Sequence, residues 1–155
     1  MKAQAIVFQQ PQQLSLQTLS LPEVCPGQIE VEVEYSGIST GTERLLWDGS
    51  MPPFPGMGYP LVPGYETVGR VTRAGDNTST RPGQRVFVPG AQCFEGVRSL
   101  FGGAASKLVV PESRTVAIQE SLGQQAVLLA LAATAYHAVA GGGQREHIRA
   151  PELIV

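Results

Sequence analysis

Residues 61–71 read LVPGYETVGRV, and they place two ionisable side chains, Tyr65 and Glu66, between a Pro-Gly turn and an apolar β-type run. Strand entries are normally occupied by residues that pack, so a phenol and a carboxylate at this point need a reason. The two side chains mark either a solvated strand end or a functional site. The sequence on both sides of this stretch bears on that choice.

Short strands separated by turn residues make up most of the chain before residue 120. Residues 29–35, IEVEVEY, alternate apolar and acidic side chains, which predicts a strand with one buried and one solvated face. The other predicted strands read KAQAIVF, LSLQTL, ETVGRVTRA, QRVFV and SKLVV, and Pro-Gly pairs flank several of them. Short strands at this spacing, with almost no helix, predict a mainly β fold, a partly open antiparallel barrel.

The period of the sequence changes at residue 120. Ser121 and Gln124 have the spacing of a helix capping box, and the following AVLLALAATAYHAVA predicts a helix that stops at glycines 141–143. Because this helix is apolar nearly all round, we expect it to be buried or divided between two packing surfaces. After a polar loop the sequence ends on PELIV, which is typical of the opening of a buried strand in a βαβ unit.

The composition argues against several classes of protein. The formal net charge is −2 and the 11 Lys and Arg residues are scattered, which disfavours a surface that follows nucleic-acid phosphates. Nothing near Met1 resembles a signal peptide and no stretch favours a membrane span, so we expect a soluble cytoplasmic protein. Cys25 and Cys93 lie far apart without metal-ligand spacing, and we expect both to be reduced.

Residues 36–71, SGISTGTERLLWDGSMPPFPGMGYPLVPGYETVGRV, resemble the GroES-like catalytic domain of the medium-chain dehydrogenase/reductase superfamily. This run and the later segments RVFVPGAQCF, SLFGGAASKLVVP and ESLGQQAVLLALAATAYHAVA are similar, more narrowly, to dehydrogenases of bacteriochlorophyll biosynthesis. The resemblance implies an NAD-dependent alcohol dehydrogenase that oxidises the 3-(1-hydroxyethyl) group of a bacteriochlorophyllide to a 3-acetyl group. Its substrate would be a chlorophyllide-type tetrapyrrole.

The resemblance also implies a division of the chain. Residues 1–119 would be the GroES-like catalytic domain, residues 120–143 a connecting helical segment, and residues 144–155 a loop with the start of a Rossmann domain. Since NAD would be bound mostly by the missing part of that domain, we expect this chain alone to be inactive. Thr134, in ATAYHAV, matches a superfamily threonine that lies beside the nicotinamide. A full-length protein would form a homodimer through the Rossmann sheet.

The resemblance bears on the metal as well. Zinc-containing relatives hold their catalytic zinc with a Cys and a His, and the matching positions here are Ser39 and Tyr65. A neutral hydroxyl and a phenol are poor ligands for zinc at neutral pH. Cys93 also stands alone in the region where those relatives carry four cysteines. We therefore predict an enzyme without zinc.

Without zinc, the hydroxyl proton of the substrate must pass through side chains or water. The resemblance places Ser39, Thr42, Glu43, Tyr65 and Glu66 nearest the reacting group. Thr42 and Glu43 match a motif whose hydroxyl relays a proton. Tyr65 either hydrogen-bonds the substrate oxygen or fills the volume that a metal would occupy. Glu66 matches a carboxylate behind the zinc ligands and has either a catalytic or a structural role, and Ser39 is either a participant or a small polar filler.

The loop at residues 47–60, WDGSMPPFPGMGYP, is too apolar for an ordinary surface and too broken for a strand or helix. Its Trp47, Phe54 and Met57 offer flat aromatic and thioether surfaces that suit a planar tetrapyrrole. Alternatively, the loop packs on its own barrel. Arg44 is the nearest cation, and it either meets a propionate of the substrate or lies on an exposed helix face.

Two other interpretations stay open. One is a zinc-free reductase of quinones or enones on the same fold. The other is a non-catalytic GroES-like module that holds a pigment or a protein partner through the apolar loop. The coding sequence after Val155 would separate the enzyme from the module, because a GxGxxG-type continuation supports an enzyme.

Overall fold

The computed structural model describes residues 1–140 of the chain, so the predicted strand at PELIV lies outside the described residues. The strands are β1 (Lys2–Gln10), β2 (Gln13–Ser20), β3 (Gln28–Ser36), β4 (Leu61–Pro63), β5 (Thr67–Ala74), β6 (Arg85–Val88), β7 (Arg98–Leu100), β8 (Lys107–Pro111) and β9 (Val116–Ala117). The helical elements are α1 (Thr42–Asp48), η1 (Glu112–Arg114), η2 (Glu120–Leu128) and α2 (Leu129–Val139). All the strands predicted within residues 1–140 are present, with ends shifted by a residue or two.

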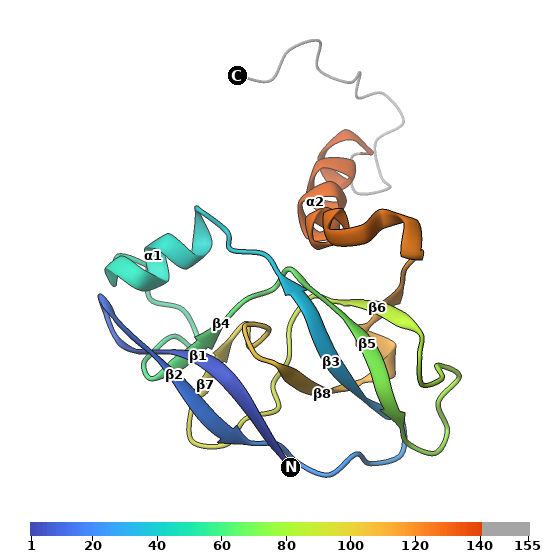
Figure 1. Ribbon diagram of the computed structural model, residues 1–155. Coiled ribbons are helices and arrows are strands. Elements are labelled where there is room, and N and C mark those ends of the chain that lie inside the picture. Colours follow the sequence, from blue (N-terminus) through green and yellow to red (C-terminus); the bar gives the residue numbers. More distant parts are fainter. Residues whose placement is uncertain (141–155) are drawn as a thin grey trace.

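The strands form two sheets, ordered β2-β1-β4-β7 and β8-β3-β5-β6-β9 (Figure 1). Residues 104–106 join them. The Ile6 N–H donates to the Ala104 carbonyl, and the Val33 N–H donates to the Ser106 carbonyl, each at 2.9 Å. Neighbouring strands run antiparallel except β4 and β7, which are parallel. The predicted partly open barrel is confirmed, with this one parallel pair as a departure.

Two apolar clusters position the candidate site. The main core lies between the sheets and includes the completely buried Ile29 and Val31 of β3. A second cluster joins Phe8 of β1, Leu46 of α1 and Leu61 of β4. Burial of each such side chain stabilises the fold by about 1.5–3 kcal/mol. The second cluster therefore holds the short helix α1 against the first sheet, where Figure 1 shows it beside the β1–β2 hairpin.

Glu30 departs from the predicted alternation of β3. Its side chain is buried, although the pattern assigns it to the solvated face. The Thr72 hydroxyl donates to Glu30 Oε1 at 2.8 Å, and Lys107 Nζ lies 3.6 Å from the same oxygen. The period-two prediction is wrong at this residue because partners on both neighbouring strands cover the carboxylate.

The predicted helix after residue 120 is present, but two details of the prediction are wrong. Ser121 is not a helix cap: η2 begins after Gln119 without a side-chain cap, and the backbone kinks at Gly123 before α2 starts. The expected burial is only partial within the described residues, where Ala126 packs with Val68 and Phe87 but Leu131 and Tyr136 are exposed. A helix prediction from apolar content reports the propensity of the segment, whereas burial depends on what packs against it.

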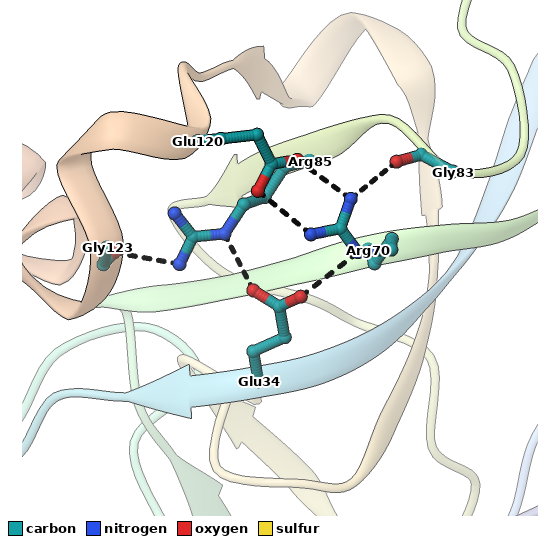
Figure 2. A network of polar contacts seen from close by, with 6 residues as sticks. All are labelled: Glu34, Arg70, Gly83, Arg85, Glu120 and Gly123. Atoms are coloured by element: carbon teal, nitrogen blue, oxygen red, sulfur yellow. Dashed lines mark hydrogen bonds and ion pairs between the residues drawn. The ribbon is translucent and has the colours of Figure 1, made fainter.

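A network of polar contacts fastens this C-terminal segment to the five-stranded sheet (Figure 2). Arg70 of β5 contacts Glu34 of β3 at 3.1 Å and Glu120 at 2.8 Å. Arg85 of β6 contacts Glu34 at 2.6 Å and donates to the Gly123 carbonyl at 2.7 Å. The kinked turn that leads into α2 is thereby held at a defined place on the barrel.

A carboxylate clamp closes the loop between β5 and β6. Glu112 accepts hydrogen bonds from the Ser79 N–H at 2.9 Å and from the amide and hydroxyl of Thr80. These donors lower the pKa of Glu112 from 4.5 to about 2. The Glu112 carboxyl therefore binds a proton more weakly in the folded state than in the unfolded state. Its contribution to the free energy of unfolding is complete above pH 4.5 and is lost as pH falls towards 2.

We expect Glu112→Gln to lower the urea midpoint at pH 7, and the gap from the wild-type midpoint to narrow at pH 3. Glutamine accepts fewer charge-assisted hydrogen bonds, so part of the clamp is lost at neutral pH. Urea titrations at the two pH values measure the gap. The same change at the exposed Glu95 is the control. A gap that is absent at pH 7, or that widens in acid, would contradict the assignment.

No helix within residues 1–140 is long and apolar enough to cross a membrane. Cys25 is exposed and Cys93 is buried, and both are free thiols. The expectation that both are reduced stays a prediction.

Candidate active site

A cavity of about 890 Å³ opens between the β1–β2 hairpin, the segment that follows β3, and α1. Its lining residues are Gln4, Ile6, Phe8, Leu14, Leu16, Ser36, Gly37, Ile38, Ser39, Thr40, Glu43, Arg44, Trp47, Pro63, Gly64, Ala104, Ala105 and Ser106. Hairpin side chains make one wall mostly apolar. Hydroxyls and a carboxyl from residues 36–43 add a small polar part, here called the polar wall, to a lining that is otherwise almost entirely apolar.

The polar wall is built by a reciprocal contact at the start of α1. Ser39 Oγ accepts a hydrogen bond from the Thr42 N–H at 3.2 Å, while the Ser39 N–H donates to Glu43 Oε2 at 2.9 Å. This is the logic of a capping box, with the acid one residue later than usual. Glu43 is drawn inward and buried as a result. The sequence STGTE therefore shapes both the helix start and the cavity wall.

Glu66 lies directly behind this wall. The Gly37 N–H donates to the Glu66 carbonyl at 2.8 Å, and a Cβ at Gly37 would overlap the Glu66 carboxyl. Only glycine therefore allows the carboxyl to lie against residue 37. Glu66 is buried, and its Oε1 has no hydrogen-bond partner among the described residues. Its charged form is consequently poorly compensated.

The two buried carboxyls are electrostatically linked. Burial raises the pKa of Glu43 above its ordinary value, and the negative charge of Glu66 raises it further, against the opposing effect of the Glu43 and Ser39 amides. Burial also raises the pKa of Glu66. Both groups therefore keep their protons to a higher pH than exposed glutamates do. A pair of this kind can accept and hold a proton near a reacting hydroxyl.

The structure brings only some of the predicted catalytic residues to the cavity. Ser39 and Glu43 line it, and Glu66 supports it from behind. Thr42 is half-buried at the first position of α1 but is not among the lining residues. Tyr65, in the connection between β4 and β5, is half-buried outside the lining as well. Its ring packs edge-on against Phe101, with centroids 5.6 Å apart.

The predicted substrate contacts divide in the same way. Arg44 and Trp47 line the cavity. Arg44 is well exposed and pairs with Asp48 at 3.5 Å. Because this pair is open to solvent, an anionic ligand can compete with Asp48 for the guanidinium. Met57 packs against the cluster around Phe8 and Leu46, and Phe54 is exposed outside the lining. Met57 therefore follows the second of the two predictions for this loop, in which the loop packs on its own barrel.

Thr134 lies in α2, at the same end of the barrel as α1 (Figure 1). Its hydroxyl donates to the Ala130 carbonyl one turn earlier, at 3.0 Å. This contact occupies the hydroxyl within the helix and leaves its oxygen able to accept a further hydrogen bond.

Sequence reasoning missed the hairpin wall. The strand pattern treats Ile6, Phe8, Leu14 and Leu16 as ordinary strand residues, yet all of them line the cavity. The alternation of leucines with polar residues in LSLQTL predicts an apolar face, and this signal is correct. It does not say that the face borders an open cavity, because that depends on where residues 36–47 lie.

Residues 25–120 match the family model described as the alcohol dehydrogenase GroES-like domain. The chain belongs to this family. Among the described residues of this GroES-like chain, no three His, Cys, Asp or Glu side chains gather where they could hold a metal ion.

Two curated relatives of this GroES-like chain carry the same name. A 2-desacetyl-2-hydroxyethyl bacteriochlorophyllide A dehydrogenase of Cereibacter sphaeroides is 52% identical over 160 aligned positions, covering 100% of this chain and 49% of the relative. Its counterpart from Rhodobacter capsulatus is 52% identical over 142 positions, covering 91% and 45%. The chain therefore spans about half the length of the curated relatives it matches.

Solved structures agree with the GroES-like fold. A short chain alcohol dehydrogenase from Escherichia coli CFT073, complexed with NADH, has a TM-score of 0.73 at 25% identity, covering 92% of this chain and 46% of that one. A cinnamyl alcohol dehydrogenase from Sorghum bicolor has a TM-score of 0.75 at 22% identity, covering 92% and 48%, which shows the fold alone. The fold class expected from the sequence is confirmed.

Proposed function

We propose that this chain is the catalytic-domain half of an NAD-dependent dehydrogenase that oxidises the 3-(1-hydroxyethyl) group of a bacteriochlorophyllide to a 3-acetyl group. The observation that carries the proposal is the large, mostly apolar cavity that Ser39 and Glu43 also line. Its volume of about 890 Å³ is within the range of about 300–1,000 Å³ for ligand sites. The names of the curated relatives supply the substrate.

The reaction removes a hydride and a proton from one carbinol group. NAD, when bound, accepts the hydride from the carbinol carbon, and Thr134 is the residue of this chain that we place beside it. The O–H proton passes to the protein as the C=O bond forms. We assign the acceptor to the Glu43 carboxylate, with the hydroxyls of Ser39 and Thr42 carrying the proton. Glu66 acts through Glu43, since its charge strengthens the basicity of that carboxylate.

We further propose that the chemistry is independent of zinc. The positions that hold the metal in zinc-containing relatives carry Ser39 and Tyr65 here. Ser39 Oγ already accepts the Thr42 N–H, and the Tyr65 ring lies against Phe101. Neutral oxygens engaged in this way do not fit a cation that prefers thiolate and imidazole. Of the two roles predicted for Tyr65, its packing on Phe101 outside the cavity lining favours the filling of volume over contact with the substrate oxygen.

The substrate itself is assigned to the cavity side of α1. Trp47 offers an aromatic surface and Arg44 a cation at the cavity, suited to the ring and to a carboxylate of a tetrapyrrole. For Phe54 and Met57, substrate contact is supported only by the apolar character of the loop at residues 47–60. A full-length protein would form a homodimer, and we place it in the cytoplasm.

The test is NAD-dependent oxidation of 3-hydroxyethyl bacteriochlorophyllide, followed by the absorption change that accompanies the new conjugated ketone. We expect turnover by the polypeptide extended through a Rossmann domain and none by this chain alone. Pigment binding without turnover in the extended form would support a binding module. Reduction of simple quinones in preference to pigment oxidation would support a reductase, and either result contradicts the proposal.

A further inference from the structure

The β1–β2 hairpin has apolar side chains on both faces. Ala5 and Val7 of β1 point into the main core. The other face carries Ile6 and Phe8, which pair in register with Leu16 and Leu14 of β2. A hairpin that only covered a core would need one apolar face, with polar residues on the other. Ile6 and Phe8 pack in the second apolar cluster, so the leucines of β2 are the part of this face that requires its own explanation.

The leucines of this second face are left open to solvent. Leu14 is 54% exposed and Leu16 is 62% exposed, and both line the cavity. Ile38, on the segment that follows β3, is 82% exposed and lines the same cavity. Single exposed leucines are common on proteins, whereas a contiguous apolar group around a concavity marks a binding site.

The geometry of the hairpin favours a flat ligand. Side chains on one face of a strand lie about 7 Å apart along it, and paired strands are about 5 Å apart. Ile6, Leu14 and Leu16 thus form a small apolar surface beside the buried Phe8, against which Trp47 packs edge-on at 5.6 Å between ring centroids. A planar ring system covers such a surface better than a chain-like ligand does.

Polar groups at the cavity give the ligand an orientation. Ser39 and Glu43 line the same cavity as the leucines, and Arg44 of α1 offers a cation there. An occupant needs a large flat apolar face, an edge with a reacting hydroxyl, and an anionic group. A stable protein interface typically buries about 800 Å² per partner, so a second copy of this chain is an outcome that the test separates.

We propose that Leu14 and Leu16 form the wall on which the tetrapyrrole ring lies, so that the hairpin determines specificity for a large planar substrate. This inference rests on the proposed function. Ile6 and Ile38 complete the contact surface. The hydroxyethyl edge of the ring then faces Ser39 and Glu43, and an acidic substituent faces Arg44.

The test compares the wild-type chain with Leu14→Thr/Leu16→Thr. Threonine suits an exposed strand, so the fold is retained while apolar contact is lost. Trp47 is the only tryptophan and lines the same cavity, so quenching of its fluorescence by 3-hydroxyethyl bacteriochlorophyllide reports occupancy. We expect the double variant to bind the pigment about tenfold more weakly. In the full-length enzyme KM rises by a similar factor with little change in kcat.

Two further variants sharpen the test. Val116→Thr makes a comparable change on an exposed strand residue outside the cavity and leaves pigment affinity unchanged. Leu14→Met/Leu16→Met keeps the apolar surface and retains binding near the wild-type level. Circular dichroism checks the fold of each variant. If the threonine variant unfolds, the methionine variant is compared with wild type instead. A strong loss of pigment affinity in a folded methionine variant overturns the proposal.

The outcomes separate the inference from the function beneath it. Oxidation of the pigment by wild-type enzyme with unchanged affinity in the threonine variant overturns the hairpin wall alone. A wild-type protein that neither binds nor oxidises the pigment overturns the proposed function as well. A dimer in sedimentation that the threonine substitutions dissociate would show that a second copy covers the leucines, and would overturn the inference.

Discussion

Replacement of Glu43 with glutamine lowers the turnover of the full-length enzyme by about 10²- to 10⁴-fold, the range for loss of a positioned proton acceptor. Glutamine has the same shape and can still accept the Ser39 N–H with its carbonyl oxygen, so the start of α1 is preserved. What disappears is the group that takes up the proton. Steady-state kcat for pigment oxidation measures the effect.

The pH dependence distinguishes this role from a structural one. Burial and the charge of Glu66 raise the pKa of Glu43, so wild-type kcat increases with pH as this raised pKa is passed. The glutamine variant lacks that limb of the profile. A raised carboxyl pKa also means that the folded state is favoured by protonation, and this contribution is lost as pH rises through the folded pKa.

A neutral side chain at position 43 therefore does not destabilise the fold at neutral pH. We expect the unfolding midpoint of Glu43→Gln to equal or exceed the wild-type value while activity falls. Glu32→Gln, at an exposed position on β3, is the control and changes neither. Turnover within threefold of wild type would remove Glu43 from the mechanism, since about 10²-fold is the least that general-base catalysis contributes.

Thr42→Val lowers turnover by about 10²-fold, because the relay assigned to its hydroxyl is lost while the shape of the side chain is kept. The contact that Thr42 makes with Ser39 uses its backbone N–H and survives the substitution. Thr42→Ser restores most of the activity because the hydroxyl returns. Single-turnover oxidation of the pigment is the suitable measurement, since it isolates the chemical step.

The outcome for Thr42 also bears on the geometry. Its side chain is half-buried and is not among the residues that line the cavity. Unchanged turnover in the valine variant would assign the proton path to Ser39 and Glu43 without it. A loss of activity in the serine variant equal to that in the valine variant would point to packing as the cause, and would contradict the relay.

The sequence predicted the barrel because local patterns decide most of it. Alternating apolar residues and Pro-Gly turns fix the strands to within a residue or two, since side-chain direction alternates along any strand. The SGISTGTE stretch likewise carries its own helix start through Ser39 and Glu43. The pattern failed at Glu30, whose burial depends on Thr72 and Lys107 from neighbouring strands.

The predicted site was only partly assembled by the fold. Motif matching placed Ser39, Thr42, Glu43, Tyr65 and Glu66 together. In the structure, Ser39 and Glu43 line the cavity, and Glu66 lies behind it against Gly37. No motif shows that Tyr65 packs on Phe101, because the two residues meet only when β4 pairs with β7.

By itself, the sequence determined the strand order along the chain, the glycine turns, the family resemblance and the pair of acids at positions 43 and 66. Only the tertiary structure decided that burial raises the pKa of both acids, that the charge of Glu66 adds to the shift of Glu43, and that Leu14 and Leu16 open onto a cavity. The physical reason is distance: backbone preferences act between residues close in sequence, whereas burial and charge coupling depend on side chains that the fold brings together from remote segments.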